Sequence, residues 1–482
     1  MSELINLPED IICYILKYLR PYDCLITTNT CISLRWNNLI IFNIVNLQND
    51  NLESFFSYLC SINNVSMERF NFVLSCSPNI HLVDNNLITP LMSACITTDL
   101  NKINNLLYMG ANINAKDING FSPILHACYS GLYYTVLFLI LAGANINDNN
   151  IHGYSILMYA SYFGFIKIVH ALIFFGVNVN HSSTSGTTAL IKACIRGHLD
   201  IIELLIDSGA DVNLHENFPL QISPDNNYYC LWSALMFACQ YNQPEVVRSL
   251  IIAGANIHYT VNNTIDQEFE NAMIIAIDQN NIEILNILIE NGCNIFNIVI
   301  KEYINDHLNY GYTTPLEYCC KKIYGNYIPM IKIIVETMIH QGSSINFINI
   351  YEETILFNII TSDTKAHLLK LFIELGADLN FTNKRGDTIF THLFYFNTQK
   401  NMLISMLVDN NCNIQHSNNL GNNALIIAVF NNFINDVKTL VKIGVNIHHV
   451  NKDGDSALSL ANKFGYQEIV EILLNDANII SV

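Results

Sequence analysis

The sequence has few positive charges. It contains 23 lysines and arginines against 41 aspartates and glutamates, which gives a formal net charge of −18 at pH 7. Proteins bind the phosphates of nucleic acids and of anionic lipids mainly through lysine and arginine, and an acidic surface repels these phosphates. We therefore expect no nucleic-acid partner.

Long hydrophobic runs are also missing, although 51% of the residues are hydrophobic. The apolar stretch 135–144 is interrupted well before the roughly 18 residues that a membrane-spanning helix needs. The N-terminus carries Glu3, Glu9 and Asp10, where a secretory signal would have a basic region followed by an apolar one. We therefore expect no membrane segment and an intracellular, cytoplasmic protein.

Several motifs of enzymes and metal-binding proteins are absent. We find no G-x-x-x-x-G-K-S/T phosphate loop, no G-x-G-x-x-G after a strand, no G-x-S-x-G elbow and no kinase H-R-D. The sequence also lacks a C-x-x-C pair and an H-E-x-x-H, so its 14 cysteines are not spaced as zinc ligands. We expect a non-catalytic protein with no metal and no cofactor. The cysteines interpreted as small core residues of helices are Cys95, Cys128, Cys194, Cys239, Cys319 and Cys320.

The segment 186–213 has the pattern of two short helices joined by a turn. Thr188 is suited to cap the first helix with its hydroxyl, and Gly197 is suited to end it in a left-handed conformation. The apolar residues of 201–206 form the stripe of a second helix, which ends at Gly209. Neither helix has enough apolar partners to be stable alone, so the unit must bury its faces against copies of itself.

The same pattern recurs along most of the chain, with a strict period of 33 residues from Thr89 to Thr188. His198 lies in the inter-helix turn of its copy, where a ring can hydrogen bond to the backbone of an adjacent repeat. The predicted helix starts are Thr89, Ser122, Ser155, Thr188, Ser233, Asn271, Thr314, Thr354, Thr388, Asn423 and Ser456. The predicted inter-helix turn residues are Gly131, Gly164, Gly197, Asn242, Asn280, Asn397, Asn432 and Gly465. The predicted ends of the second helices are Gly110, Gly143, Gly176, Gly209, Gly254, Gly292, Gly342, Gly376, Asn411 and Gly444.

This pattern resembles the ankyrin repeat, whose first helix begins T-P-L-H-x-A within a period of 33 residues. The resemblance implies an all-α-dominated ankyrin-repeat solenoid, built of helix-turn-helix units with short hairpin fingers, that binds other proteins. We expect about eleven units over residues 89–482. A degenerate repeat at 47–88 is expected to precede them, because terminal repeats are commonly atypical.

Residues 1–46 do not follow the repeat and predict a small module of three helices. Pro8 suits the first position of a helix, and the acidic Glu9 and Asp10 suit its positive end. Pro21 ends this helix, and two shorter helices are predicted to follow it.

This N-terminal segment resembles the F-box, the adaptor-binding module of ubiquitin-ligase substrate receptors, through L-P-E-D-I at 7–11 and a downstream tryptophan. The alternative is that its helices only cap the exposed face of the first repeat. By the resemblance, a Skp-type adaptor carried by a cullin ligase would be bound by Leu7, Pro8, Ile11, Ile15, Leu16, Leu19, Leu25 and Trp36.

Asparagine and isoleucine are over-used, as in proteins of AT-rich genomes. We interpret the asparagines as residues of turns and fingers between the helices. Together with the repeat array, the bias resembles the ankyrin proteins of giant DNA viruses of amoebae, of the mimivirus type, with an amoeboid protist as the alternative source. For a viral protein, the expected location is the host cytoplasm.

Three function hypotheses follow. The first is a receptor that recruits an unknown protein substrate to a Skp/cullin-type ubiquitin ligase through the N-terminal module. The second is an ankyrin scaffold, or an inhibitor of a host protein, with no ligase recruitment. The third is an unrecognised enzyme, which the missing motifs disfavour.

Three successive fingers are longer than the regular pattern and predict the binding site. Insertions in a solenoid go to loops on one face, often the binding face. We therefore predict a partner site on the fingers of 211–312 and on the concave surface of their first helices. The longest finger contains Tyr228, Tyr229 and Trp232, and aromatic residues are enriched at partner contacts. The alternative for Trp232 is packing against the neighbouring repeat.

Shortening residues 214–230 to the regular finger length tests this site. We expect weaker capture of protein substrates in a quantitative pull-down, with unchanged adaptor binding and unchanged helix content by circular dichroism. If the deletion melts the array, the segment is structural. If substrates bind normally, the site lies elsewhere.

Overall fold

The computed structural model describes residues 79–223, 226–262, 269–296, 298–304, 307–321, 327–348, 352–360, 365–396 and 400–479, together with 56, 59–61, 67, 70, 71 and 74. The predicted F-box-like module, residues 1–46, therefore lies outside the described residues. The chain divides into two compact units, Met1–Asn256 and Ile257–Val482.

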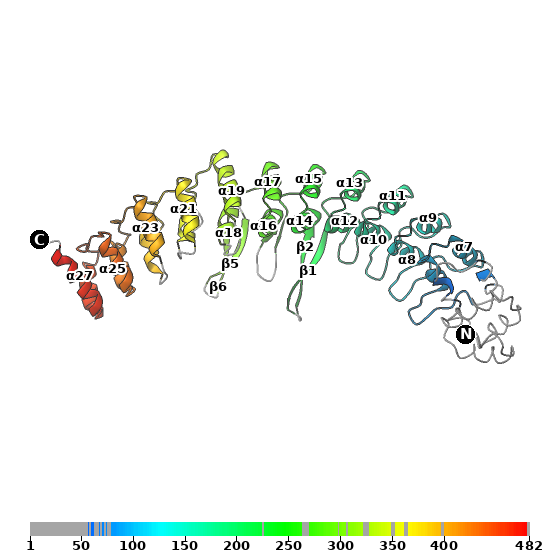
Figure 1. The fold of residues 1–482 in the computed structure, drawn as a ribbon, viewed down its shortest axis with the longest axis horizontal. Coiled ribbons are helices and arrows are strands. Elements are labelled where there is room, and N and C mark those ends of the chain that lie inside the picture. The colour runs from blue at the N-terminus through cyan, green and yellow to red at the C-terminus, as the bar shows by residue number, and fades with distance from the viewer. Residues whose placement is uncertain are drawn as a thin grey trace, which may run out of the picture. The chain divides into compact units, whose positions relative to one another are not determined.

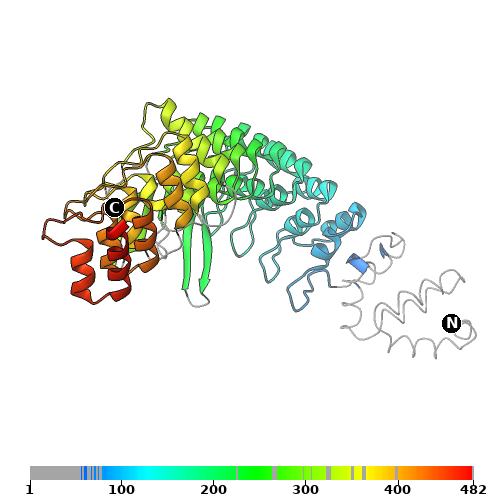
Figure 2. The ribbon, with the colours of Figure 1, turned by 60° about the vertical axis from the view of Figure 1, so that its left-hand side comes forward.

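The first unit is a row of helix pairs that follow one another in chain order from blue to green (Figure 1). One hairpin of two antiparallel strands interrupts them, and Figure 2 shows it extending away from the helices. The elements are α6 (Pro90–Cys95), α7 (Leu100–Tyr108), α8 (Pro123–Tyr129), α9 (Tyr133–Leu141), α10 (Ile156–Phe163), α11 (Ile166–Phe174), α12 (Ala189–Arg196), α13 (Leu199–Asp207), β1 (His215–Ser223), β2 (Asn226–Ser233), α14 (Ala234–Gln240) and α15 (Pro244–Ile252).

The second unit repeats this plan, with two hairpins. Its elements are β3 (Thr260–Asn262), β4 (Phe269–Asn271), α16 (Ala272–Asp278), α17 (Ile282–Glu290), β5 (Ile298–Ile304), β6 (His307–Thr313), α18 (Pro315–Lys321), α19 (Ile328–His340), α20 (Ile355–Ile359), α21 (Ala366–Glu374), α22 (Ile389–His392), the 3-10 helix η3 (Leu393–Tyr395), α23 (Asn401–Asp409), α24 (Ala424–Phe430), α25 (Ile434–Lys442), α26 (Ala457–Phe464) and α27 (Gln467–Ile479). The helix-dominated fold predicted from the sequence is confirmed.

The three lengthened fingers are the three hairpins. β1 pairs with β2 from His215 opposite Ser233 to Ser223 opposite Asn226, with an irregularity after Leu220. β3 pairs with β4 over three residue pairs, from Thr260 opposite Asn271. β5 pairs with β6 in a regular antiparallel register. The extra residues of each finger therefore form additional strand pairs, and the first helices that follow them, α14, α16 and α18, have seven residues each.

The first helices begin at the predicted capping residues. In the repeat analysed from the sequence, the Thr188 hydroxyl accepts a hydrogen bond from the backbone N–H of Ile191 at 3.2 Å. This bond satisfies one of the N–H groups that lack a partner at a helix start. Side-chain caps of this kind form at all the predicted starts except Ser122 and Thr354.

The predicted turn residues have the left-handed backbone that their types allow. The inter-helix turns have positive φ at every predicted position within the described residues, and Asn397 lies outside them. All the predicted ends of the second helices also have positive φ. The left-handed backbone conformation therefore recurs along the chain at the positions that the sequence repeat predicts.

The core lies between neighbouring helix pairs. Five residues of α12 are buried: Ala189, Leu190, Ile191, Ala193 and Cys194. This helix contacts α10 and α14 of the two adjacent repeats as well as its own partner α13. A short helix thus acquires a nearly complete apolar environment only within the stack. The nine cysteines whose side chains the structure describes are buried, and the six predicted as small core residues are among them.

A ladder of asparagines joins the ends of successive repeats. In the first unit, Asn147 Oδ1 accepts a hydrogen bond from the backbone N–H of Asn178 at 2.9 Å. Asn180 Oδ1 accepts one from Asp211 at 2.8 Å, while its Nδ2 donates to the carbonyl of Gly209 at 2.9 Å. A short side chain with both a donor and an acceptor suits this position, which accounts for part of the asparagine excess. The corresponding bonds of the second unit link Asn346 to Asp378, Asn380 to Asn413 and Gln415 to Asn446.

The turn histidine connects two repeats, as predicted. His198 Nε2 lies 3.2 Å from the backbone carbonyl of Tyr162 in the preceding repeat. The ring rests on Gly164, where an added Cβ would lie 2.7 Å from the ring carbon Cε1. Gly164 also has a φ of +78°, so this glycine serves both the turn and the contact with the next repeat.

Two glycine substitutions separate these effects. Gly164 and Gly176 have similar positive φ angles, but nothing lies within 4 Å of an added Cβ at Gly176. Because a left-handed residue with a Cβ costs about 1–2 kcal/mol, we expect Gly176→Ala to destabilise the protein by about that amount. Gly164→Ala must in addition displace His198, which adds about 1–3 kcal/mol. Urea unfolding of the two variants measures the difference, and equal losses would contradict the ring contact.

An aromatic groove as the candidate binding site

A single side chain closes each regular finger ahead of its first helix. Asp117 Oδ1 accepts hydrogen bonds from the backbone N–H groups of Asn119, at 2.9 Å, and Phe121, at 2.7 Å. Asn150 makes the same two bonds one repeat later, to the residues two and four positions on. These bonds fix the finger base, so Phe121 and Tyr154 stand beside the starts of α8 and α10.

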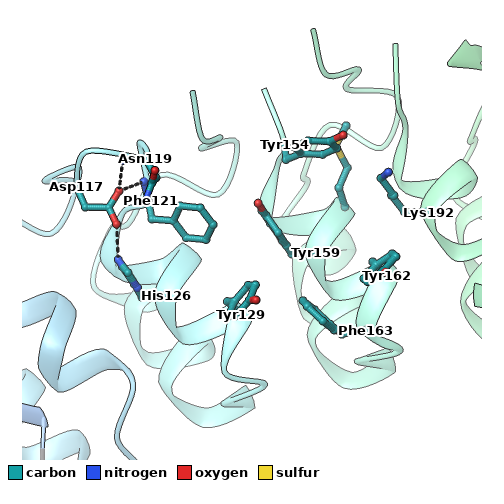
Figure 3. A pocket seen from close by; sticks show the side chains of 11 residues that line it. Asp117, Asn119, Phe121, His126, Tyr129, Tyr154, Tyr159, Tyr162, Phe163 and Lys192 are labelled. Atoms are coloured by element: carbon teal, nitrogen blue, oxygen red, sulfur yellow. Dashed lines mark hydrogen bonds and ion pairs between the residues drawn. The ribbon is translucent and has the colours of Figure 1, made fainter. Parts of the chain in front are cut away.

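Three neighbouring first helices supply the rest of the site. His126 of α8, Tyr159 of α10 and Lys192 of α12 are each four positions after a helix cap, so they form one row across the repeats. Together with the finger residues they line a groove of about 650 Å³ (Figure 3). The complete lining is Asp117, Asn119, Phe121, His126, Tyr129, Tyr154, Met158, Tyr159, Tyr162, Phe163 and Lys192.

The rings of this groove contact one another edge to face or at a tilt. The Phe121 ring centroid lies 5.4 Å from that of Tyr159 and 6.1 Å from that of Tyr129. The Tyr129 centroid lies 5.2 Å from that of Phe163, and the two planes meet at 85°. Tyr129 remains 54% exposed and Phe163 37% exposed. These contacts hold the rings in place and leave apolar ring surface open to a partner.

At one end of the groove, the polar groups of Asp117 and His126 are paired with each other. Asp117 Oδ2 lies 3.1 Å from His126 Nε2. Burial lowers the pKa of His126 below its ordinary value, although the neighbouring carboxylate opposes this shift. The imidazole is therefore neutral at pH 7, and its Nε2–H donates to Asp117. This pair positions Phe121 and the finger.

Tyr159 is held by a hydrogen bond as well as by ring contacts. Asn150 Nδ2 donates a hydrogen bond to its phenol oxygen at 3.0 Å. Burial is the main cause that raises the pKa of Tyr159 to about 12, so the phenol stays protonated. The middle of the groove thus has no charge.

The other end of the groove is basic. Lys192 Nζ lies 5.1 Å from the centroid of the Tyr154 ring and 3.6 Å from Glu216 Oε1. The guanidinium carbon of Arg196, the last residue of α12, lies 5.0 Å from the centroid of the Tyr162 ring. These are cation–π distances, and they place two positive charges beside the aromatic surface.

The arrangement is suited to binding. The imidazole of His126 is paired with the carboxylate of Asp117. Within the described ranges, no group of three histidine, cysteine, aspartate or glutamate side chains could hold a metal ion. A concave site lined by apolar rings with a few placed polar groups is typical of ligand and peptide recognition.

The structure places the predicted finger residues as follows. Tyr228 and Tyr229 lie in β2, and their side chains are outside the described set. Trp232 is only 5% exposed, and its ring centroid lies 5.3 Å from that of Phe237 in α14. These contacts agree with packing within the array, the alternative given for Trp232 above. All the residues predicted to bind the adaptor precede the described part of the chain.

The groove lies in repeats that precede the lengthened fingers, outside the partner site predicted from the sequence. One signal was present. The last turn of the first helix has large rings in two adjacent repeats, seven or eight positions after the helix cap: Tyr129, Tyr162 and Phe163. These positions follow the residues of α8 and α10 that are buried in the stack. Large rings at these exposed positions in adjacent copies indicate a surface for contact.

Among the helices that the structure describes, none has the length and apolar character of a membrane span. The family model of ankyrin repeats in three copies matches the chain repeatedly, in overlapping segments that run from residue 56 to residue 481. The segments are 56–150, 124–216, 157–261, 215–299, 235–349, 356–451 and 397–481.

A similar curated protein is a putative ankyrin repeat protein of Acanthamoeba polyphaga mimivirus. It is 26% identical to this chain over an alignment that covers 35% of this chain and 38% of the relative. This chain thus spans well under half of that protein's length. Because the family matches cover most of the sequence and the structure shows the expected helix pairs, the chain belongs to the ankyrin-repeat family, whose arrays are protein-protein interaction scaffolds.

Proposed function

We propose that this protein is a substrate receptor of a Skp/cullin-type ubiquitin ligase. In this proposal, the aromatic groove of the first unit binds the target protein. Residues 1–46 bind the Skp-type adaptor, which brings the cullin. The observation that carries the proposal is an open aromatic groove on an ankyrin-repeat array, in a chain that also has an F-box-like motif at 1–46.

The groove supports target binding through its chemistry. Tyrosine, tryptophan and arginine dominate the residues that carry most of the binding energy in protein interfaces. The groove offers Tyr129, Tyr159 and Tyr162, with Arg196 at its end. Its rings are held by one another, so little side-chain freedom is lost when a partner binds.

The N-terminal motif supports adaptor binding through its sequence alone. Leu7 and Pro8 precede an apolar face formed by Ile11, Ile15 and Leu16. A module of about 46 residues cannot cover such a face by itself, so a partner surface is needed. The two partners would then use different parts of the chain.

The alternative is an ankyrin scaffold, or an inhibitor of a host protein, that recruits no ligase. It keeps the groove as the target site and assigns residues 1–46 to capping the array. The likeness to a mimivirus protein favours a viral source, and hence the cytoplasm of the host as the place of action. Both alternatives need the groove, and only the receptor needs the adaptor.

Replacing Leu7 and Pro8 together with alanine tests the ligase role. We expect the affinity for the adaptor to fall by more than about tenfold, because the change removes two side chains that would be buried in the interface. The circular dichroism of the array should not change, since each repeat is stabilised only by its neighbours. Binding of purified Skp-type adaptor to the full chain is the measurement. A folded double variant that binds the adaptor normally would leave the scaffold as the function.

The target site is tested with Tyr129→Ala and Phe163→Ala. Both rings are partly exposed, so stability should change little, while the loss of an anchor should cost about 2 kcal/mol in binding, or roughly 30-fold. Phe174→Ala is a matched control, because this ring is 82% exposed and lies outside the groove lining. Proteins retained from eukaryotic cells are compared by quantitative mass spectrometry. If Phe174→Ala loses target proteins while Tyr129→Ala and Phe163→Ala retain them, the target site lies elsewhere.

A further inference from the structure

The charges at the groove differ in their access to solvent. Asp117, the acidic residue of the lining, has a side chain that is only 5% exposed, and both its oxygens are engaged. His126 is neutral, as shown above. The charges that a partner would meet are therefore those of Lys192 and Arg196.

These two cations lie four residues apart on α12, so they project from the same face of the helix. Lys192 is largely balanced by Glu216, whose Oε1 also accepts a hydrogen bond from the Thr187 hydroxyl. Arg196 is exposed, and no carboxylate of a described residue lies within ion-pair distance of it. One positive charge at the basic end of the groove thus has no negative partner within the described chain.

The contact with Tyr162 orients Arg196 without using its hydrogen-bond donors. A guanidinium group over a ring keeps its N–H edges for another acceptor, and a carboxylate fits such an edge with two parallel bonds. A continuous series of ring contacts leads from this position, through Tyr162, Phe163 and Tyr129, to Phe121. The groove therefore presents an apolar surface that ends at an anion-binding group.

We propose that the groove binds an extended segment of a partner protein that carries apolar or aromatic side chains followed by an aspartate or glutamate. The apolar side chains lie on Tyr129 and Phe163, and the carboxylate pairs with Arg196. The proposal rests on the groove being the target site proposed above. Packed helices are about 10 Å apart and an extended chain advances about 3.3 Å per residue, so anchors on successive repeats are about three residues apart.

The acidic character of the whole chain limits the number of acidic residues in such a segment. A net charge of −18 repels a strongly acidic partner. At physiological salt this repulsion is screened beyond about 8 Å, whereas a direct contact with Arg196 is not. The segment is therefore expected to carry one or two carboxylates beside its apolar anchors, and not an acidic run.

A library of random 12-residue peptides displayed on phage, selected on the full chain, provides the probes. We expect the selected peptides to combine phenylalanine, leucine or tyrosine with one or two acidic residues about three positions away. Selection of peptides rich in lysine and arginine would overturn the proposal in favour of a basic partner. Failure to select any peptide would also overturn it, because a linear segment would then not be the ligand.

A charge exchange tests the pairing with Arg196. The selected acidic peptide, labelled with fluorescein, should bind Arg196→Glu and Arg196→Gln about tenfold more weakly or worse, because a hydrogen-bonded charge pair is lost. The same peptide with lysine in place of its acidic residue should bind Arg196→Glu better than the wild type. The control is Lys442→Glu, which makes the same reversal of charge at an exposed position of the second unit. It should not change the affinity for either peptide.

Two outcomes distinguish this proposal from the proposed function. If Tyr129→Ala loses the cellular target while Arg196→Glu retains it and binds the acidic peptide normally, the groove is the target site and the proposed chemistry is wrong. If Tyr129→Ala retains the target, the groove itself is not the site. Arg196 is exposed, so its variants are expected to fold, and circular dichroism checks this.

Discussion

The structure depends on the burial of each first helix between two copies of itself. Helices of six to nine residues such as α6 and α12 are too short to be stable in water by themselves. In the array, α12 contacts α10, α14 and α13, and its apolar and small residues are buried. The apolar core is shared between neighbouring repeats. Side-chain packing therefore sets the distance between each repeat and the next.

Hydrogen bonds between repeats keep this spacing in register. The asparagine ladder links successive helix ends, and the side chains that close the fingers hold the connections at fixed positions. A residue such as Tyr159 therefore stands beside its counterparts His126 and Lys192, although 33 residues separate each pair. The positions that packing leaves free become the binding surface, and their identities can change without loss of the fold.

The groove illustrates how such a surface gains its chemistry. Burial keeps His126 neutral and Tyr159 protonated, so the centre of the groove is uncharged. Arg196 and Lys192 supply positive charge in a chain that is otherwise strongly acidic. The rings pack against one another and provide a rigid contact area. The positive charges of Lys192 and Arg196 then favour those apolar partners that also carry a negative charge. Such a site is suited to recognising a segment of another protein.

The sequence by itself determined the helix starts, the left-handed turns, the buried cysteines and the family, because caps, glycines and apolar stripes act over a few residues. It also predicted the inter-repeat contact of His198, since that ring stands in a fixed position of the repeat. Only the tertiary structure decided that Trp232 is buried against Phe237 and that Phe121, Tyr129 and Phe163 share one groove. Those contacts depend on the angle and distance at which side chains of neighbouring elements meet, and a linear pattern does not contain that geometry.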